Sequence, residues 1–190
     1  MKIYNLQDNL TNEFMYVYSP ACKVFKTFNK EAGCICNDFN SEINDWDYVS
    51  IITKDKYKSG CTVKTKCSFK SFGAPLIVFS NDITKDENGY LRYGHHYEIV
   101  AYENGINVWC IDPDPSNTQK AVAVKKVDFI EFSVEAGSEF ELEVKIEGNK
   151  ITSKMLGFEL VAEDDAVPEE FHVGITACEG KNCFYEFSAE

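Results

Sequence analysis

Apolar and polar residues alternate along much of the chain, which is the pattern of β-strands that are buried on one face. In 140–146, Phe, Leu, Val and Ile alternate with Glu and Lys, and in 61–70 small or apolar residues alternate with Lys and Ser. The short run 76–79 is continuously apolar, as in a strand that is buried on both faces. No stretch has a clear helical period, so we expect about eleven to thirteen strands.

The most informative stretch is 90–112, which predicts two strands joined by a tight turn. Asn104-Gly105 favours a two-residue type I′ turn, because both central residues of that turn need a positive φ. A turn at this place sets Val100 opposite Trp109 on the neighbouring strand.

The predicted hairpin has two different faces, because side chains alternate across a strand. One face is apolar and indicates a core contact: Tyr97, Ile99, Ala101, Ile106, Val108 and Cys110. The opposite face, called here the aromatic–polar face, mixes rings with hydrogen-bonding groups: His96, Glu98, Val100, Tyr102, Asn107, Trp109 and Ile111. A sheet surface that only meets water does not need a Trp and a Tyr, so this face is the candidate binding surface. Arg92 joins it if the strand starts early, or pairs with Asp86 or Glu87 in the preceding loop.

Turn-forming residues predict where the remaining strands end. Polar residues and glycines predict a break at 71–74 and a turn at 179–182, before the last strand. Another strand is expected at 46–53, whereas 1–45 has the weakest pattern. Neither a linker rich in Pro, Ser and Gly nor an internal repeat divides the chain. We therefore expect one all-β domain over 1–190, built as an antiparallel β-sandwich.

A second tight hairpin is predicted with its turn at 148–149. Its register sets Glu147 opposite Lys150 and Glu143 opposite Lys154. Opposite charges that face each other across two strands are mildly stabilising. This acidic run therefore indicates a solvated surface and not a pair of catalytic carboxylates.

Charge and composition limit the partners. Of the 190 residues, 44% are hydrophobic and 14% aromatic, and the net charge is −12. Nucleic acids and anionic membranes attract basic surfaces, so neither is an expected partner. The first residues contain no apolar segment of the signal-peptide type, and no apolar run approaches membrane-spanning length, which predicts a cytoplasmic protein. The oligomeric state is left open.

The eight cysteines are expected to be reduced thiols, because no secretion signal is present. Cys34-Ile-Cys36 is too close for ordinary zinc-motif spacing, and Cys178 and Cys183 lack a second matching pair, so zinc is disfavoured. We expect no cofactor, with calcium as the open alternative.

The calcium alternative depends on the acidic loop that follows the hairpin. Asp112, Asp114 and Asn117 carry oxygen atoms of the kind that bind Ca²⁺. Asp-Pro and Ser-Asn are also common turn-forming pairs, and we prefer that simpler interpretation.

Two short motifs resemble those of a known superfamily. They are the hairpin strands 97–102 and 107–109, and the ending HVGITACEG at 172–180 followed by FYEF at 184–187. From about Trp46 onward the chain resembles the concanavalin A-like lectin/glucanase superfamily, which includes laminin G-like domains. The resemblance implies a jelly roll of two antiparallel sheets, one of them concave. It also implies that a sugar binds on the concave face or at its rim.

We therefore expect non-catalytic binding of an oligosaccharide, or of another small polar ligand, on the aromatic–polar face. The expected ligand-binding residues are His96, Glu98, Tyr102, Asn107, Trp109 and Arg92. Aromatic rings stack on sugars, while carboxylate and amide groups bond hydroxyls, as in other small-ligand sites. Two alternatives remain. The face could dock a partner protein, or an N-terminal segment or long loop could cover Trp109 and Tyr102 and form a second small core.

An enzymatic alternative assigns His96 and Glu98, two residues apart on one face, as an acid–base pair acting on oligosaccharides. The retaining glucanases of the superfamily carry a Glu-x-Asp-x-(x)-Glu strand. Here the matching run extends from Glu98 to Glu103, with Val100 in place of the Asp. A regular hairpin also places Glu103 on the opposite face, so we do not transfer the glucanase activity.

Overall fold

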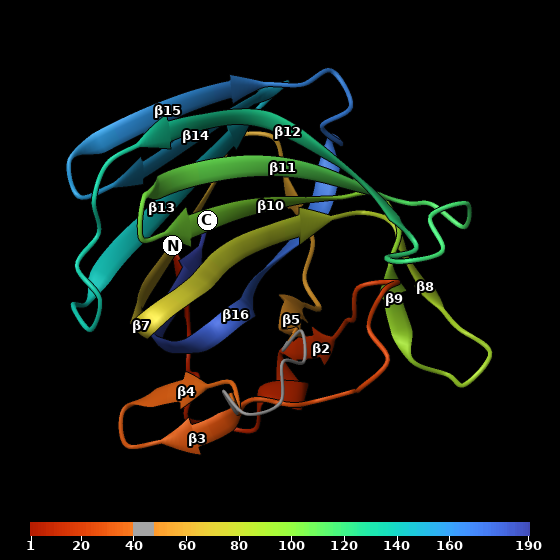
Figure 1. Ribbon diagram of the computed structural model, residues 1–190, viewed down its shortest axis with the longest axis horizontal. Helices are drawn as coiled ribbons and strands as arrows, with labels where there is room; N and C mark the ends of the chain where they lie inside the picture. The colour runs from red at the N-terminus through yellow and green to blue at the C-terminus, as the bar shows by residue number, and fades with distance from the viewer. Residues whose placement is uncertain (40–47) are drawn as a thin grey trace.

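The computed structural model describes residues 1–39 and 48–190, and these residues fold almost entirely into β-strands (Figure 1). The strands are β1 (Lys2–Tyr4), β2 (Phe14–Tyr16), β3 (Asn29–Glu31), β4 (Cys34–Cys36), β5 (Val49–Thr53), β6 (Tyr57–Lys58), β7 (Cys61–Ser80), β8 (Ile83–Lys85), β9 (Leu91–Tyr93), β10 (His96–Tyr102), β11 (Gly105–Pro113), β12 (Val122–Glu131), β13 (Phe140–Glu147), β14 (Lys150–Met155), β15 (Phe158–Glu163) and β16 (Glu170–Ala189). A single 3₁₀ turn, η1 (Leu10–Asn12), is the one helical element of the described residues, and none of these residues forms a helix long and apolar enough to cross a membrane.

Two strands of 20 residues each, β7 and β16, organise the sandwich. They pair with each other along nearly their whole length. On its other edge, β7 pairs with β13 in its first half and with β10 in its second half. One layer therefore runs β12-β11-β10 into the second half of β7, and the other runs β15-β14-β13 into its first half (Figure 1). This arrangement confirms the predicted all-β, antiparallel sandwich.

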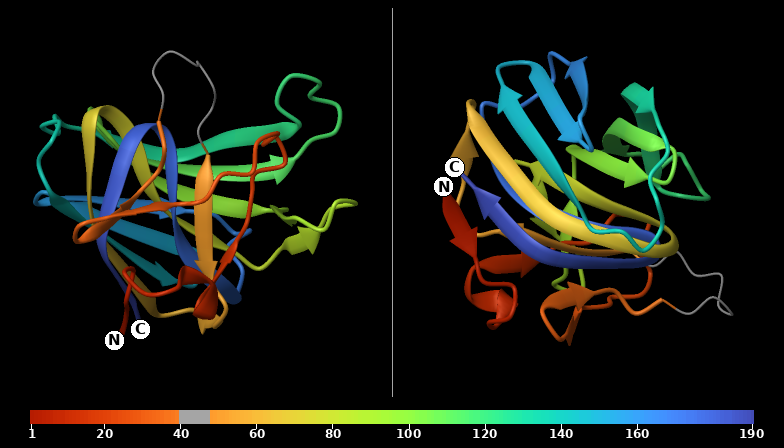
Figure 2. Two further views of the ribbon diagram at one scale, coloured as in Figure 1. Left: turned by 90° about the horizontal axis from the view of Figure 1, so that it is seen from below. Right: turned by 90° about the vertical axis from the view of Figure 1, so that its left-hand side faces the viewer.

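The predicted break at 71–74 and the predicted turn at 179–182 are wrong, because both segments lie inside continuous strands. Gly73 pairs with Gly180, and the β16 register shifts on either side of Gly180. β7 and β16 thus bend together at this glycine pair, where both long strands pass from one layer to the other (Figure 2). β-Bulges increase the local bending of a strand, so turn-like residues are favoured there without ending it.

The predicted strand at 46–53 is present as β5, which begins at Val49. Trp46 and Asp47 lie outside the described residues. The first and last strands, β1 and β16, pair with each other, so the two ends of the chain lie side by side (Figures 1 and 2).

The β10–β11 hairpin forms, but its turn differs from the prediction. Tyr102 pairs with Gly105, so the turn contains Glu103 and Asn104, and Glu98 rather than Val100 faces Trp109. Gly105 has a φ of 130°, whereas Asn104 does not have the positive φ that a type I′ turn requires. The register differs from the predicted one by two residues, and a shift of two leaves every side chain on its predicted face.

The predicted core face of this hairpin is confirmed. All six of its residues belong to the main core between the two layers: Tyr97, Ile99, Ala101, Ile106, Val108 and Cys110. The register of the second hairpin is confirmed as well, with Glu147 opposite Lys150 and Glu143 opposite Lys154.

A second, smaller core lies on the other side of the β10 layer, where the N-terminal segment packs against it. It contains ten buried side chains: Val17, Tyr18, Cys22, Tyr48, Ile52, Ala74, Leu76, Val78, Tyr93 and Val100. Tyr102 and Trp109 pack against its margin and stay partly exposed. The N-terminal segment therefore covers one part of the aromatic–polar face and leaves the part near Tyr102 and Trp109 open.

Candidate functional site

The uncovered part of the aromatic–polar face forms a cleft with two adjoining pockets. The outer pocket encloses about 340 Å³, and the inner pocket about 180 Å³. Tyr102 and Trp109 line both pockets, so the two rings mark the place where the pockets meet. The cleft lies over β10, β11 and β12, with the bend of β16 at its inner end.

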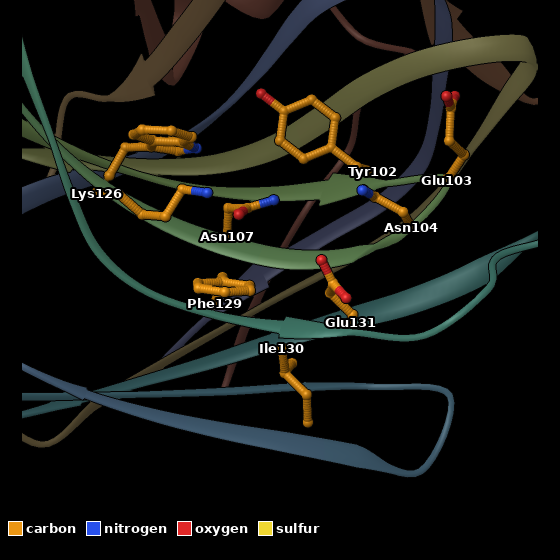
Figure 3. A pocket seen from close by; sticks show the side chains of 9 residues that line it. Tyr102, Glu103, Asn104, Asn107, Lys126, Phe129, Ile130 and Glu131 are labelled. Atoms are coloured by element: carbon orange, nitrogen blue, oxygen red, sulfur yellow. The ribbon is translucent and has the colours of Figure 1, made fainter.

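The outer pocket combines aromatic rings with charged and amide groups. It is lined by Tyr102, Glu103, Asn104, Asn107, Trp109, Lys126, Phe129, Ile130 and Glu131. Figure 3 shows Tyr102, Asn107, Lys126 and Phe129 around one open space, while Ile130 points to the other side of the sheet. The Lys126 ammonium lies 5.0 Å from the centre of the Trp109 ring and 4.6 Å from that of Phe129. This exposed cation thus sits between two rings, where a flexible side chain can give way to a ligand.

The inner pocket brings together two carboxyl groups from distant parts of the chain. Glu98 comes from β10, and Glu179 comes from the bend of β16. The backbone of Glu179 has a φ of 56°, a conformation that is costly for a residue with a side chain. Strained positions of this kind cluster at ligand-binding and catalytic sites.

The Glu98 carboxyl group is hydrogen-bonded to the buried side chain of Tyr48. The Tyr48 hydroxyl donates a hydrogen bond of 2.8 Å to Glu98 Oε1. Burial raises the pKa of the Tyr48 hydroxyl, and the neighbouring Glu98 raises it further, so this group stays protonated and remains a donor. Burial likewise raises the pKa of Tyr102, which therefore offers a neutral hydroxyl to the cleft.

His96 shares the face of Glu98 but lines neither pocket. It is 1% exposed, its ring stacks on Tyr93, and its Nε2 lies 3.5 Å from Glu98 Oε1. Its Nδ1 lies 2.8 Å from the Gly94 carbonyl oxygen, which can only accept, so Nδ1 carries hydrogen. A hydrogen bond between Nε2 and Glu98 then needs one further proton on either group. His96 Nε2 has no hydrogen-bond partner, and the buried ring has no contact surface for a ligand.

Arg92 lies in β9, outside both pockets, where it ties a loop to the N-terminal segment. Its Nε donates to Asp86 at 2.8 Å, and its Nη1 donates to the carbonyl oxygens of Ser19 and Cys22. The alternative pairing of Arg92 with Asp86 is therefore the one that forms.

The three oxygen-bearing residues considered for calcium each have hydrogen-bond partners of their own. Asp112 is 2.7 Å from His95 Nδ1, and Asp114 accepts from the backbone and hydroxyl of Ser116. Asn117 bonds to backbone groups of its own turn. Each residue thus serves local turn or strand contacts.

Sequence reasoning placed Glu98, Tyr102, Asn107 and Trp109 in one region, and the cleft contains all four. Among the cleft residues that it missed are Tyr48, Lys126, Phe129, Glu131 and Glu179. Tyr48 and Glu179 reach the cleft only through long-range strand pairing, which leaves no local signal. Lys126 could have been placed beside Trp109 only if the pairing of β12 with β11 had been known.

Comparison with known proteins identifies the fold. No protein-family profile matches the chain, and no curated protein matches it either. Among solved structures, the carbohydrate-binding module CBM66 from Bacillus subtilis superposes with a TM-score of 0.62 and 12% identity, over 92% of this chain and 99% of that one. A family 16 endo-glucanase from Bacteroides ovatus gives a TM-score of 0.59 and 8% identity, over 100% and 99% of the two chains. A family 7 alginate lyase gives 0.54 and 10%, over 86% and 82%.

These structures are similar to the chain in fold alone, since all the identities are low. They share its layers of antiparallel strands, and the resemblance predicted from the two sequence motifs is confirmed at that level. The chain has the concanavalin A-like jelly-roll fold.

Proposed function

We propose that the protein binds an oligosaccharide in the cleft over β10, β11 and β12, without cleaving it. The observation that carries this proposal is the position of Tyr102 and Trp109, two half-buried rings shared by two adjoining pockets. The N-terminal segment covers the neighbouring apolar surface and leaves these rings open.

The polar groups around the rings support a sugar rather than an apolar ligand. Asn107 and Glu131 line the outer pocket, and Glu98 lines the inner one. Such groups bond hydroxyls while the rings pack against the apolar faces of a sugar, which matches the usual composition of small-ligand sites. Similar folds that are described as a carbohydrate-binding module and an endo-glucanase are consistent with this ligand class.

The test is oligosaccharide binding by Trp109→Ala, measured by calorimetry against a panel of glycans. We expect loss of at least ~10-fold in affinity, because aromatic residues at the centre of a site supply most of the binding energy. Phe158→Ala is the matched control: Phe158 is 43% exposed on β15, outside the cleft, and this variant should bind as the wild type does. A glycan that binds Trp109→Ala and the wild type equally would contradict the proposal.

Hydrolysis is a second candidate function, favoured by one observation. Glu98 and Glu179 line the same inner pocket, and glycoside hydrolases use two carboxyl groups that flank the scissile bond. Turnover of a bound oligosaccharide, abolished by Glu98→Gln and by Glu179→Gln but not by Glu103→Gln, would establish it. Binding without turnover in the wild type supports the non-catalytic proposal.

A further inference from the structure

Three thiols from two distant segments meet in the described part of the chain. Cys34 and Cys36 lie on β4, and Cys183 lies on β16, directly opposite Cys36. The three sulfur atoms all lie within 4.8 Å of one another, and the sulfurs of Cys34 and Cys36 are 3.6 Å apart. Residues two apart on a strand point to the same face, and directly paired residues share a face, so Cys34, Cys36 and Cys183 lie on one face of the sheet.

The spacing of the sulfurs suits a bound metal ion. Tetrahedral zinc with Zn–S bonds of ~2.3 Å holds its sulfur ligands ~3.8 Å apart. Cys36 is 0% exposed, and Cys34 and Cys183 are each 5% exposed, so all three cysteines are buried. Sequence spacing alone disfavoured zinc, because Cys183 is remote from the Cys34–Cys36 pair until the strands associate.

The carboxylate nearest to this cluster in sequence and pairing is Glu31, which lies outside the group of three sulfurs and would have to rotate its exposed side chain inward to act as a fourth ligand. Glu31 lies directly opposite Cys34 on β3, and its side chain is exposed. Its carboxylate forms a 2.5 Å ion pair with Lys181. A zinc ion with three thiolates and one carboxylate carries excess negative charge, and the adjacent ammonium of Lys181 offsets part of it.

We propose that Cys34, Cys36 and Cys183 bind one Zn²⁺ ion, with Glu31 as the fourth ligand. Binding converts three thiols into three coordinated thiolates and releases their three protons to the solvent. The site joins the β3–β4 hairpin to β16, to which β4 is paired by only two residue pairs. The ion would therefore serve a structural role, fastening the hairpin to the sandwich, and is independent of the cleft.

The experiment uses the full chain, reduced and freed of metal. Titration with Co²⁺ should give the visible bands of a tetrahedral site and near-ultraviolet thiolate charge-transfer absorption, saturating at one equivalent and lost on addition of Zn²⁺. X-ray absorption of the zinc-loaded wild type should count three sulfur ligands and one oxygen. This second readout needs no variant, so it is unaffected by any folding defect.

Variants assign the ligands. Cys183→Ser should abolish the thiolate bands, and Glu31→Gln should weaken Co²⁺ binding at least ~10-fold. Cys178→Ser, on the same strand but outside the cluster, should bind Co²⁺ as the wild type does. The proposal fails if the reduced wild type gives no charge-transfer band, or if Cys183→Ser keeps it. It also fails if protein purified with reductant contains a Cys36–Cys183 disulfide.

Discussion

The Tyr48 hydroxyl donates a 2.8 Å hydrogen bond to the Glu98 carboxyl group beneath the inner pocket. Tyr48 is 3% exposed and Glu98 is 7% exposed, so water does not readily replace either partner. The bond links the residue that precedes β5 to the middle of β10, two segments that are 50 residues apart. It therefore contributes both to the second core and to the position of a cleft carboxyl group.

Tyr48→Phe should lower the free energy of unfolding by ~1–3 kcal/mol, because it leaves a buried carboxyl group without its donor. Urea denaturation monitored by circular dichroism measures the change. Tyr90→Phe is the control, because it also removes one hydroxyl group but from a residue that is 40% exposed. This variant should change the free energy of unfolding by less than ~0.5 kcal/mol. Equal effects of the two variants would mean that the Tyr48–Glu98 bond contributes nothing to stability.

The charges of the cleft predict a preference for neutral oligosaccharides. Glu103 and Glu131 line the outer pocket beside the cation Lys126. Two further carboxyl groups, of Glu98 and Glu179, line the inner pocket beside the cation Lys120, so the cleft has four carboxyl groups and two ammonium groups. Like charges brought together at an interface cost several kcal/mol. An oligosaccharide that carries uronic acids should bind at least ~10-fold more weakly than a neutral one of equal length.

Calorimetry with such a matched pair of glycans measures this preference. Replacing Glu103 and Glu131 together with Gln should reduce the difference, and added salt should reduce it as well. If the acidic glycan binds more tightly, and Lys126→Ala removes that advantage, then Lys126 recognises an anionic group and the predicted preference is wrong.

The Asp86–Arg92 pair predicts a pH dependence of stability. Burial acts to raise the pKa of Asp86, but hydrogen bonds from Arg92 and from the backbone N–H groups of Tyr90 and Asn88 outweigh it, and the pKa is lowered from 3.8. A carboxyl group with a lowered folded-state pKa stabilises the protein above its unfolded pKa, and this contribution is lost as the pH falls. Because Arg92 also holds Ser19 and Cys22, the pair fastens the N-terminal segment.

Asp86→Asn should therefore be less stable than the wild type at neutral pH, and the difference should shrink below about pH 4. Urea midpoints of both proteins, measured from about pH 7 down to about pH 3, test this. A difference that stays constant over this range would show that the charge of Asp86 does not contribute.

The faces of the β10–β11 hairpin were predictable from the sequence, although its register was not. The two-residue period of a strand is a local property, so Trp109 and Tyr102 were assigned to one face without knowledge of the turn. The position of the turn depends on small free-energy differences between neighbouring turns. The two turn residues are Glu103 and Asn104, and not the predicted Asn104 and Gly105. The predicted face survived because the error was an even number of residues.

Residues that reach a site through long-range pairing could not be located in the same way. Glu179 enters the inner pocket because β16 bends beside β7, and Cys183 meets Cys36 because β16 pairs with β4. Local patterns predict a turn at Glu179, and they place Cys183 in the last strand without indicating which strand lies beside it. Strand partners are set by the whole fold, whereas periodicity and turn residues report only neighbours in sequence.

The shared bend of β7 and β16 leads to a last prediction, based on two glycines with similar backbone angles. Gly180 has a φ of 64° and Gly148 a φ of 61°, so an Ala at either position has the same unfavourable conformation. A Cβ at Gly180 would lie 2.1 Å from the Phe72 carbonyl oxygen, whereas a Cβ at Gly148 would meet nothing within 4 Å. Gly148→Ala should cost ~1–2 kcal/mol of stability, the ordinary penalty of a left-handed residue.

Gly180→Ala should cost a further ~1–3 kcal/mol, because the methyl group forces apart two paired backbones. Urea unfolding of both variants measures the difference, and equal losses would mean that the two strands are not tightly apposed at the bend. Since Glu179 precedes Gly180 and lines the inner pocket, Gly180→Ala should also weaken ligand binding, whereas Gly148→Ala should not. If Gly180→Ala loses stability but binds the ligand with unchanged affinity, then the bend does not position ligand-binding groups. The ligand would then occupy the outer pocket alone.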